Sequence, residues 1–195
     1  MATKQEILDA AVVLFAGKGT AFSMTELADA VGIRAPSLYS HFPSKEEILG
    51  ALVRREVASC RQALSEAVAQ LQGSCRENAA QTFRFLLDYF SCGERLRFWK
   101  NMMLLEDDKL RAGCLAELIA QNSWLTQQLE RWLQQGAEAG ELSCAPDKDA
   151  VEAYYAILLG ALDNLLLRQG TDFDAAAYGG RLFTAWWRSV GGKPQ

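Results

Sequence analysis

Apolar residues recur along the chain at the three- and four-residue spacing of an α-helix. Between residues 4 and 16 they fall on one side of such a helix, at Ile7, Leu8, Ala11, Leu14 and Phe15. Residues three and four apart share a helix face, so this spacing predicts an amphipathic helix. Thr3 and Glu6 fit a capping box at its start, and Gly17 and Gly19 are expected to end it.

Two shorter helices are predicted next. Ser23 and Glu26 fit a second capping box, and the helix that follows is expected to stop at Gly32, because glycine readily adopts a positive φ. Pro36 suits the first turn of the next helix, where a missing N–H costs little. Pro43 is expected to close that helix.

The remainder of the chain keeps the helical period and shows no alternation typical of a β-strand. Six more helices are predicted, at residues 44–72, 77–92, 95–105, 109–139, 148–168 and 174–190. Glycines and polar clusters separate these ranges. The predicted fold class is all-α, with about nine helices.

Composition favours a folded protein with a substantial core. Of the 195 residues, 50% are apolar and 10% are aromatic, which is too apolar for a disordered chain. No apolar run is expected to span a bilayer, which takes roughly 18 to 20 residues, and the N-terminus has no apolar signal core. We therefore expect a cytoplasmic protein without a membrane partner.

The cysteines are odd in number and widely spaced, and none forms a C-x-x-C pair. They are Cys60, Cys75, Cys92, Cys114 and Cys144. This pattern fits neither a disulfide framework nor a zinc site. Reduced, mostly buried thiols are the main expectation, with a redox-sensing pair as the alternative. No metal and no cofactor are predicted.

The two short helices joined through Gly32 form a helix-turn-helix unit. In such a unit the second helix can enter the major groove of DNA, where its first turn, Arg34 to Ser37, would meet base edges. The net charge of −4 does not favour nucleic acid. Up to Arg55 the chain carries equal numbers of basic and acidic residues, so charge alone would not have indicated DNA.

Several residues around this unit suit phosphate groups. Tyr39 and His41 offer donors at the end of the second helix, and Lys45 lies at the N-terminus of the next one. Ser23 and Thr25 offer hydroxyls at the start of the first. His41 is the only histidine and has no cysteine or acidic pair nearby, so no catalytic residue and no enzymatic activity are predicted.

The same segment carries an ordered series of motifs. They are Leu27-Ala28, Gly32-Ile33, Ser37-Leu38-Tyr39, His41-Phe42 and Ser44-Lys45-Glu46, preceded by a helix that ends in Phe15-x-x-x-Gly19. Together they resemble the DNA-binding segment of the tetracycline-repressor (TetR) family of bacterial transcriptional regulators. The resemblance implies a three-helix helix-turn-helix DNA-binding domain at residues 1–48. It also implies a helical ligand-binding and dimerisation domain at residues 49–195.

The resemblance assigns roles within the DNA-binding segment. It implies phosphate contacts by Ser37, Tyr39, His41 and Lys45. It implies that Arg34, Ala35, Pro36 and Ser40 face the bases. Three of these four base-facing residues carry few donors, so Arg34 is expected to provide most of the direct readout, with thymine-methyl contacts to Ala35 and Pro36.

For the C-terminal part the resemblance implies an effector pocket and a two-fold homodimer. Large apolar side chains are candidates to line the pocket: Phe83, Phe90, Phe98, Trp99, Met102, Trp124 and Tyr155. Asn101 and Asn122 are possible polar fixtures, and a hydrophobic small molecule is the expected ligand. Each of these residues could equally be plain core.

The last two helices are the expected dimer interface. Glycines at positions 160, 179 and 180 lie mid-helix, where close helix–helix approach would offset their cost. The predicted interface residues are Leu158, Leu162, Leu165, Phe183 and Trp186. A two-fold dimer matches a palindromic operator in double-stranded DNA.

The predicted function is therefore a ligand-responsive transcriptional regulator, a repressor that a hydrophobic small molecule releases from its operator. Two alternatives come from the same sequence. One is a regulator that responds to cysteine oxidation, and the other is a helical binding protein without a DNA function.

Overall fold

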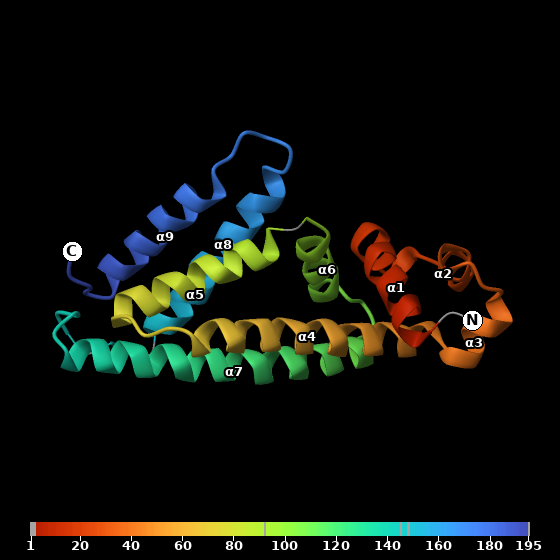
Figure 1. The fold of residues 1–195 in the computed structure, drawn as a ribbon, viewed down its shortest axis with the longest axis horizontal. Coiled ribbons are helices and arrows are strands. Elements are labelled where there is room, and N and C mark those ends of the chain that lie inside the picture. Colours follow the sequence, from red (N-terminus) through yellow and green to blue (C-terminus); the bar gives the residue numbers. More distant parts are fainter. Residues whose placement is uncertain (1–2, 92, 145, 148, 195) are drawn as a thin grey trace. The chain divides into compact units, whose positions relative to one another are not determined.

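Nine α-helices make up the part of the chain that the computed structural model describes (Figure 1). They are α1 (Lys4–Lys18), α2 (Met24–Val31), α3 (Ala35–His41), α4 (Lys45–Ala69), α5 (Cys75–Phe90), α6 (Gly93–Met103), α7 (Asp108–Glu138), α8 (Asp149–Leu167) and α9 (Ala175–Ser189), with a 3-10 turn, η1 (Gly19–Ala21), after α1. The predicted all-α class is confirmed. An isolated bridge between Leu142 and Gly192 is the strand-like pairing found in the described part.

The structure describes residues 3–91, 93–144, 146–147 and 149–194, without the side chains of residues 114–115, 117–118 and 120–121. Cys92 and the side chain of Cys114, which the sequence analysis considered among the thiols, lie outside the described residues.

Local sequence signals set several helix starts. The capping boxes at Thr3 and Ser23 are both formed, with each hydroxyl accepting the N–H of the glutamate three residues later. Ser44 likewise accepts the N–H of Glu47 at 3.3 Å. A further capping box at Ser74 starts α5 two residues earlier than predicted.

The chain divides into two compact units. Unit 1 comprises residues 1–60 and 94–120, and unit 2 comprises residues 61–93 and 121–195. Unit 1 therefore extends beyond the predicted DNA-binding segment, because α6 packs against α1. The Phe98 and Phe15 rings meet edge to face at 5.2 Å, and both are buried.

Unit 2 is built around an aromatic cluster in which α5, α8 and α9 pack together (Figure 1). The Tyr154 ring lies 5.4 Å from Phe83 and 4.9 Å from Trp186, and the Trp186 indole donates to the Ala150 carbonyl at 2.8 Å. Close approach of α9 to α5 depends on Gly179, where a Cβ would lie 2.3 Å from Leu87 Cδ1.

Helix α8 corrects one expectation from the sequence. It is 19 residues long, and by length and composition it is apolar enough to cross a membrane. The helix carries apolar residues on two sides. Tyr154, Leu158 and Leu162 are buried in unit 2, while Leu159 and Leu167 are exposed. A core helix of this kind meets the same criterion, so α8 is weak support for a membrane span.

Candidate nucleic-acid interface

The turn between α2 and α3 has the geometry that the glycine predicts. Gly32 adopts the left-handed conformation, with φ 71° and ψ 31°. Its N–H donates to the Asp29 carbonyl at 3.1 Å, and the N–H of Ile33 donates to the Ala28 carbonyl at 3.0 Å. This pair of hydrogen bonds is a Schellman motif, which closes α2 and redirects the chain into α3.

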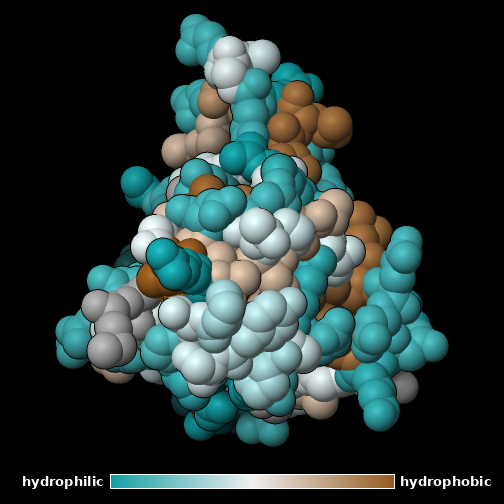
Figure 2. Space-filling model, turned by 90° about the vertical axis from the view of Figure 1, so that its right-hand side faces the viewer, coloured by the Kyte–Doolittle hydropathy of each residue, from teal (hydrophilic) through white to brown (hydrophobic). Residues whose placement is uncertain are grey.

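Helix α3 is anchored on one side and open on the other. Leu38 and Phe42 are buried, whereas Pro36, Ser37, Tyr39 and Ser40 are exposed and Ala35 is half-buried. Arg34 precedes the helix as its N-cap residue, with an exposed side chain that makes no capping hydrogen bond. Figure 2 faces the side of Figure 1 on which α2 and α3 are drawn, and teal residues lie there among white and brown ones. The outer side of α3 is therefore free to meet a ligand.

The start of α2 already holds a carboxylate. Glu26 accepts the Ser23 N–H at 2.7 Å and forms an ion pair with Lys18. The Lys18 ammonium and then the Ser23 N–H lower the pKa of Glu26 from 4.5 to about 2. The Ser23 hydroxyl accepts from Glu26 N but keeps its own proton to donate, and the Thr25 side chain is exposed. Only part of the predicted anion site is thus open.

Lys45 has a role that the sequence did not indicate. Its ammonium donates to the Thr20 carbonyl and lies 4.7 Å from the centre of the Phe22 ring. This contact joins the start of α4 to the segment between α1 and α2. An ammonium has three protons, so Lys45 can hold this position and still donate to a phosphate.

His41 is half-buried and lines a groove of about 750 Å³ in unit 1, together with Lys4 and Phe42. The Lys4 ammonium lies 5.4 Å from the centre of the Phe42 ring. Lys4 is a second cation beside the predicted phosphate-binding residues. The apolar pattern of the first helix does not indicate a role for Lys4.

The candidate pocket residues fall into two groups. Phe98, Trp99 and Met102 are buried in unit 1, where Asn101 donates to backbone carbonyls of α1. The other four belong to unit 2: Phe83, Phe90, Trp124 and Tyr155. Phe83 lines a groove of about 280 Å³ between α5 and α9, and the Tyr155 hydroxyl donates to the Asn122 carbonyl at 3.2 Å. The seven residues do not share one compact unit.

The predicted dimer residues are mostly internal. Leu158, Leu162, Phe183 and Trp186 are buried within unit 2, and Leu165 is half-buried. The reason is that an amphipathic helix directs its largest apolar side chains to its own core. The interface role of these residues stays a prediction, and within one copy these four side chains leave little surface for a second copy. The exposed apolar side chains of α8 are instead Leu159, at 47%, and Leu167, at 82%.

The described cysteines and acidic residues do not favour the redox alternative or a metal. Cys60 and Cys75 are buried and Cys144 is exposed, and burial raises the pKa of the Cys75 thiol to about 12. A protonated, buried thiol is a poor nucleophile and a slow target for oxidants. Within the described residues, no cluster of three or more His, Cys, Asp or Glu side chains could hold a metal ion.

Comparison with known proteins identifies the segment that contains this interface. Residues 7–52 match the family model for bacterial regulatory proteins of the tetR family. A stretch of 52 residues is 44% identical to the HTH-type transcriptional repressor KstR2 of Rhodococcus jostii (strain RHA1), and covers 26% of this chain and 26% of that repressor. This match assigns residues 7–52 to the tetR family.

Solved structures of tetR-type regulators share the fold along nearly the whole chain. The regulator FadR from Bacillus subtilis, in complex with stearoyl-CoA, superposes with a TM-score of 0.78 at 17% identity, over 98% of this chain and 100% of that one. The ketosteroid regulator KstR2 of Mycobacterium tuberculosis gives 0.73 at 20% identity, over 98% and 96%. The fold along the chain is that of these regulators.

The sequence match covers a shorter part of the chain than the fold match does. All of the predicted DNA-contact residues, from Ser23 to Lys45, lie inside the matched residues 7–52. The candidate pocket and dimer residues lie outside them, where the likeness is one of fold.

Proposed function

We propose that the chain is a cytoplasmic transcriptional repressor, without enzymatic activity, that binds a palindromic operator as a homodimer. A hydrophobic small molecule releases it. The observation that carries the DNA-binding proposal is the open face of α3, preceded by the exposed Arg34 and set at a fixed angle to α2 by the turn at Gly32.

The exposed residues divide into base readers and phosphate contacts. Arg34 makes no ion pair among the described residues, and its guanidinium can donate two parallel hydrogen bonds to a guanine. Ala35 and Pro36 beside it offer apolar contact to a thymine methyl group. Ser37, Tyr39 and Thr25 carry exposed hydroxyls suited to phosphate oxygens.

Fluorescence anisotropy tests these roles on a duplex that the wild-type protein selects from a random pool. Arg34→Ala is expected to cost about 1–3 kcal/mol on the selected duplex and little on others, since base contacts carry the specificity. Tyr39→Phe is expected to weaken binding by a similar factor on every duplex, because phosphates carry no sequence information. Arg84→Ala, at an exposed position of α5, is the matched control.

Equal losses for Arg34→Ala on all duplexes would reject Arg34 as the base reader. If the wild-type protein selects no sequence at all, the DNA-binding proposal itself fails.

The exposed side of α8 and α9 is the proposed dimer face. Leu159 and Leu167 are exposed there, and Gly160 and Gly180 have no atom near the position of a Cβ. Glycines at open positions of two helices allow the backbones of two copies to approach closely. Leu159→Arg is expected to yield monomers in light scattering after size exclusion, while Arg131→Ala, at an exposed position of α7, stays dimeric. A dimeric Leu159→Arg protein would contradict this choice of face.

The effector is proposed to be a molecule with a long apolar part. One protein of the same fold was solved with stearoyl-CoA, and another is named a ketosteroid regulator. Stearoyl-CoA is a direct probe: it is expected to lower affinity for the selected duplex, whereas coenzyme A alone leaves it unchanged. Unchanged affinity with saturating stearoyl-CoA and with a 3-ketosteroid would reject the hydrophobic effector.

A further inference from the structure

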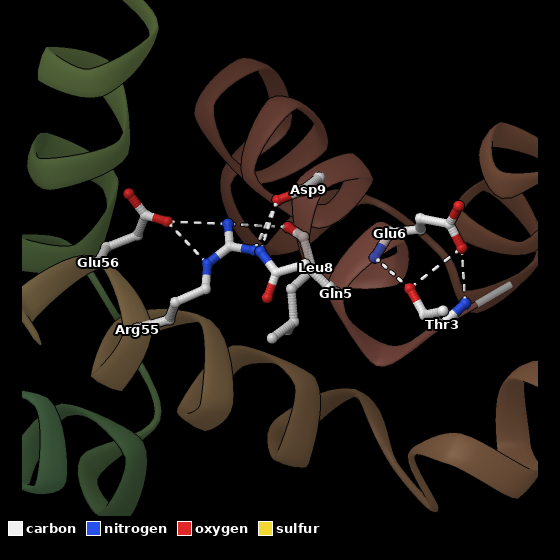
Figure 3. A network of polar contacts seen from close by, with 7 residues as sticks. All are labelled: Thr3, Gln5, Glu6, Leu8, Asp9, Arg55 and Glu56. Carbon is white, nitrogen blue, oxygen red and sulfur yellow. Dashed lines mark hydrogen bonds and ion pairs between the residues drawn. The ribbon is translucent and has the colours of Figure 1, made fainter. Parts of the chain in front are cut away.

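Helix α1 is held near its middle by a side chain of α4. Figure 3 shows Arg55 reaching from α4 to α1, where its guanidinium pairs with Asp9 at 2.7 Å and donates to the Leu8 carbonyl at 3.4 Å. Glu56 accepts from the same guanidinium at 2.8 and 3.0 Å. The Arg55 side chain is only 22% exposed. A planar guanidinium with several engaged donors fixes direction as well as distance.

The C-terminal end of α1 is held separately by α6. The Asn101 amide donates to the Phe15 carbonyl at 2.7 Å and to the Ala16 carbonyl at 3.2 Å. The Phe15 carbonyl also accepts the N–H of Gly19, and its second lone pair is available to the amide donor from α6. The edge-to-face contact of Phe98 with Phe15 lies beside these hydrogen bonds.

The same end of α1 determines where α2 begins. Lys18, the last residue of α1, pairs with Glu26, and Glu26 caps α2 through the Ser23 N–H. Helix α2 has eight residues and α3 has seven. Helices this short have little stability of their own, so their orientation follows from the contacts around them.

We propose that Arg55 and Asn101 are positioning residues for sequence-specific DNA reading. They touch no DNA. Two contact points fix the direction of α1, whereas a single one would leave a pivot, and α1 in turn orients α2 and α3 through Lys18 and Glu26. The inference rests on the proposed DNA-binding function, and it concerns the discrimination between sequences rather than binding as such.

The test compares Arg55→Ala, Asn101→Ala and the double variant on two duplexes, the one selected by the wild-type protein and a scrambled one. Each single variant is expected to lose about tenfold in affinity for the selected duplex and less than about twofold for the scrambled one. The slope of affinity against salt concentration should stay unchanged, because the phosphate contacts remain. The double variant is expected to lose more than either single variant.

Two further variants separate positioning from general stability. Arg55→Lys keeps the charge beside Asp9 but lacks the fork, so an intermediate loss of specificity is expected, and it serves if Arg55→Ala does not fold. Arg84→Ala, whose arginine pairs only within α5, is expected to behave as wild type. Thermal unfolding followed by circular dichroism verifies that each variant is folded at the assay temperature.

Equal losses on both duplexes would show a merely structural role and overturn the inference. Full retention of specificity in the double variant would also overturn it, while leaving the proposed function intact. If the wild-type protein does not discriminate between duplexes, the proposed function and this inference fall together.

Discussion

The two compact units of this chain are organised by different kinds of contact. In unit 1 the short helices α2 and α3 bury Leu27 and Leu38, and their direction is set in addition by caps, a left-handed glycine and single polar contacts such as Lys18 with Glu26. In unit 2 the helices α5, α8 and α9 are placed by buried aromatic rings. Polar contacts set direction, whereas apolar burial supplies most of the stability.

This difference suggests a division of sensitivity between the units. Substitutions in unit 2 should lower the free energy of unfolding strongly. Substitutions of the polar contacts in unit 1 should change what DNA is bound while costing little stability. Measured stabilities and DNA affinities of variants in each unit can contradict this contrast.

The largest effect is expected for Trp186→Ala in unit 2. The indole is 1% exposed, packs 4.9 Å from the Tyr154 ring and donates to the Ala150 carbonyl. Its removal leaves a cavity and deletes the hydrogen bond to the Ala150 carbonyl, at a cost of about 3–5 kcal/mol. Urea unfolding followed by circular dichroism measures the loss. Arg188→Ala, an exposed neighbour, is expected to stay within about 0.5 kcal/mol of wild type.

A loss below about 1 kcal/mol for Trp186→Ala would mean that the aromatic cluster is not the main source of stability in unit 2. The contrast between the units would then disappear.

An intermediate loss in the free energy of unfolding is expected for Gly179→Ala, and none for the comparison variant Gly17→Ala. A Cβ at Gly179 in α9 would lie 2.3 Å from Leu87 Cδ1, so Gly179→Ala should destabilise unit 2 by about 1–3 kcal/mol. Gly17 in α1 has open space around it and an ordinary helical φ. Gly17→Ala should therefore be neutral or stabilise by up to about 1 kcal/mol. Thermal unfolding of both variants gives the comparison, and equal shifts would contradict it.

The same contrast explains what could be predicted from the sequence. The helix-turn-helix depends on neighbours in the chain: Ser23 with Glu26, the turn at Gly32 and Pro36 in the first turn of α3. Each of these signals lies within a few neighbouring residues. The order of the helices and the open face of α3 could therefore be predicted from the sequence. The capping box at Ser74 was equally local and was missed, which misplaced the start of α5 by two residues.

Longer-range contacts carried no such signal. Lys45 reaches Thr20 across 25 positions and Asn101 reaches Phe15 across 86. From the sequence alone, Lys45 is predicted to contact a phosphate and Asn101 to line the effector pocket. The sequence does not indicate their distant partners in the chain. In α8 the adjacent Leu158 and Leu159 are chemically identical, yet one is buried and the other exposed. Only the packing of α5 and α9 decides which side of such a helix faces inward.

The smallest effect concerns the ion pair that joins α1 to α2. Because Lys18 and the Ser23 N–H lower the pKa of Glu26 from 4.5 to about 2, the folded state favours the ionised carboxylate. Its contribution to stability is present above pH 4.5 and is lost as the pH falls from 4.5 towards 2.

Glu26→Gln should lower the unfolding temperature by only about 1–2 °C near neutral pH, since the pair is exposed, and by nothing near pH 2. Lys18→Gln should reduce the pH dependence in the same range, because Lys18 is the largest cause of the lowered pKa. Melting curves of the three proteins between pH 2 and pH 7 measure this, and parallel curves for wild type and Glu26→Gln would mean that the contact from α1 to α2 does not depend on the charge of Glu26.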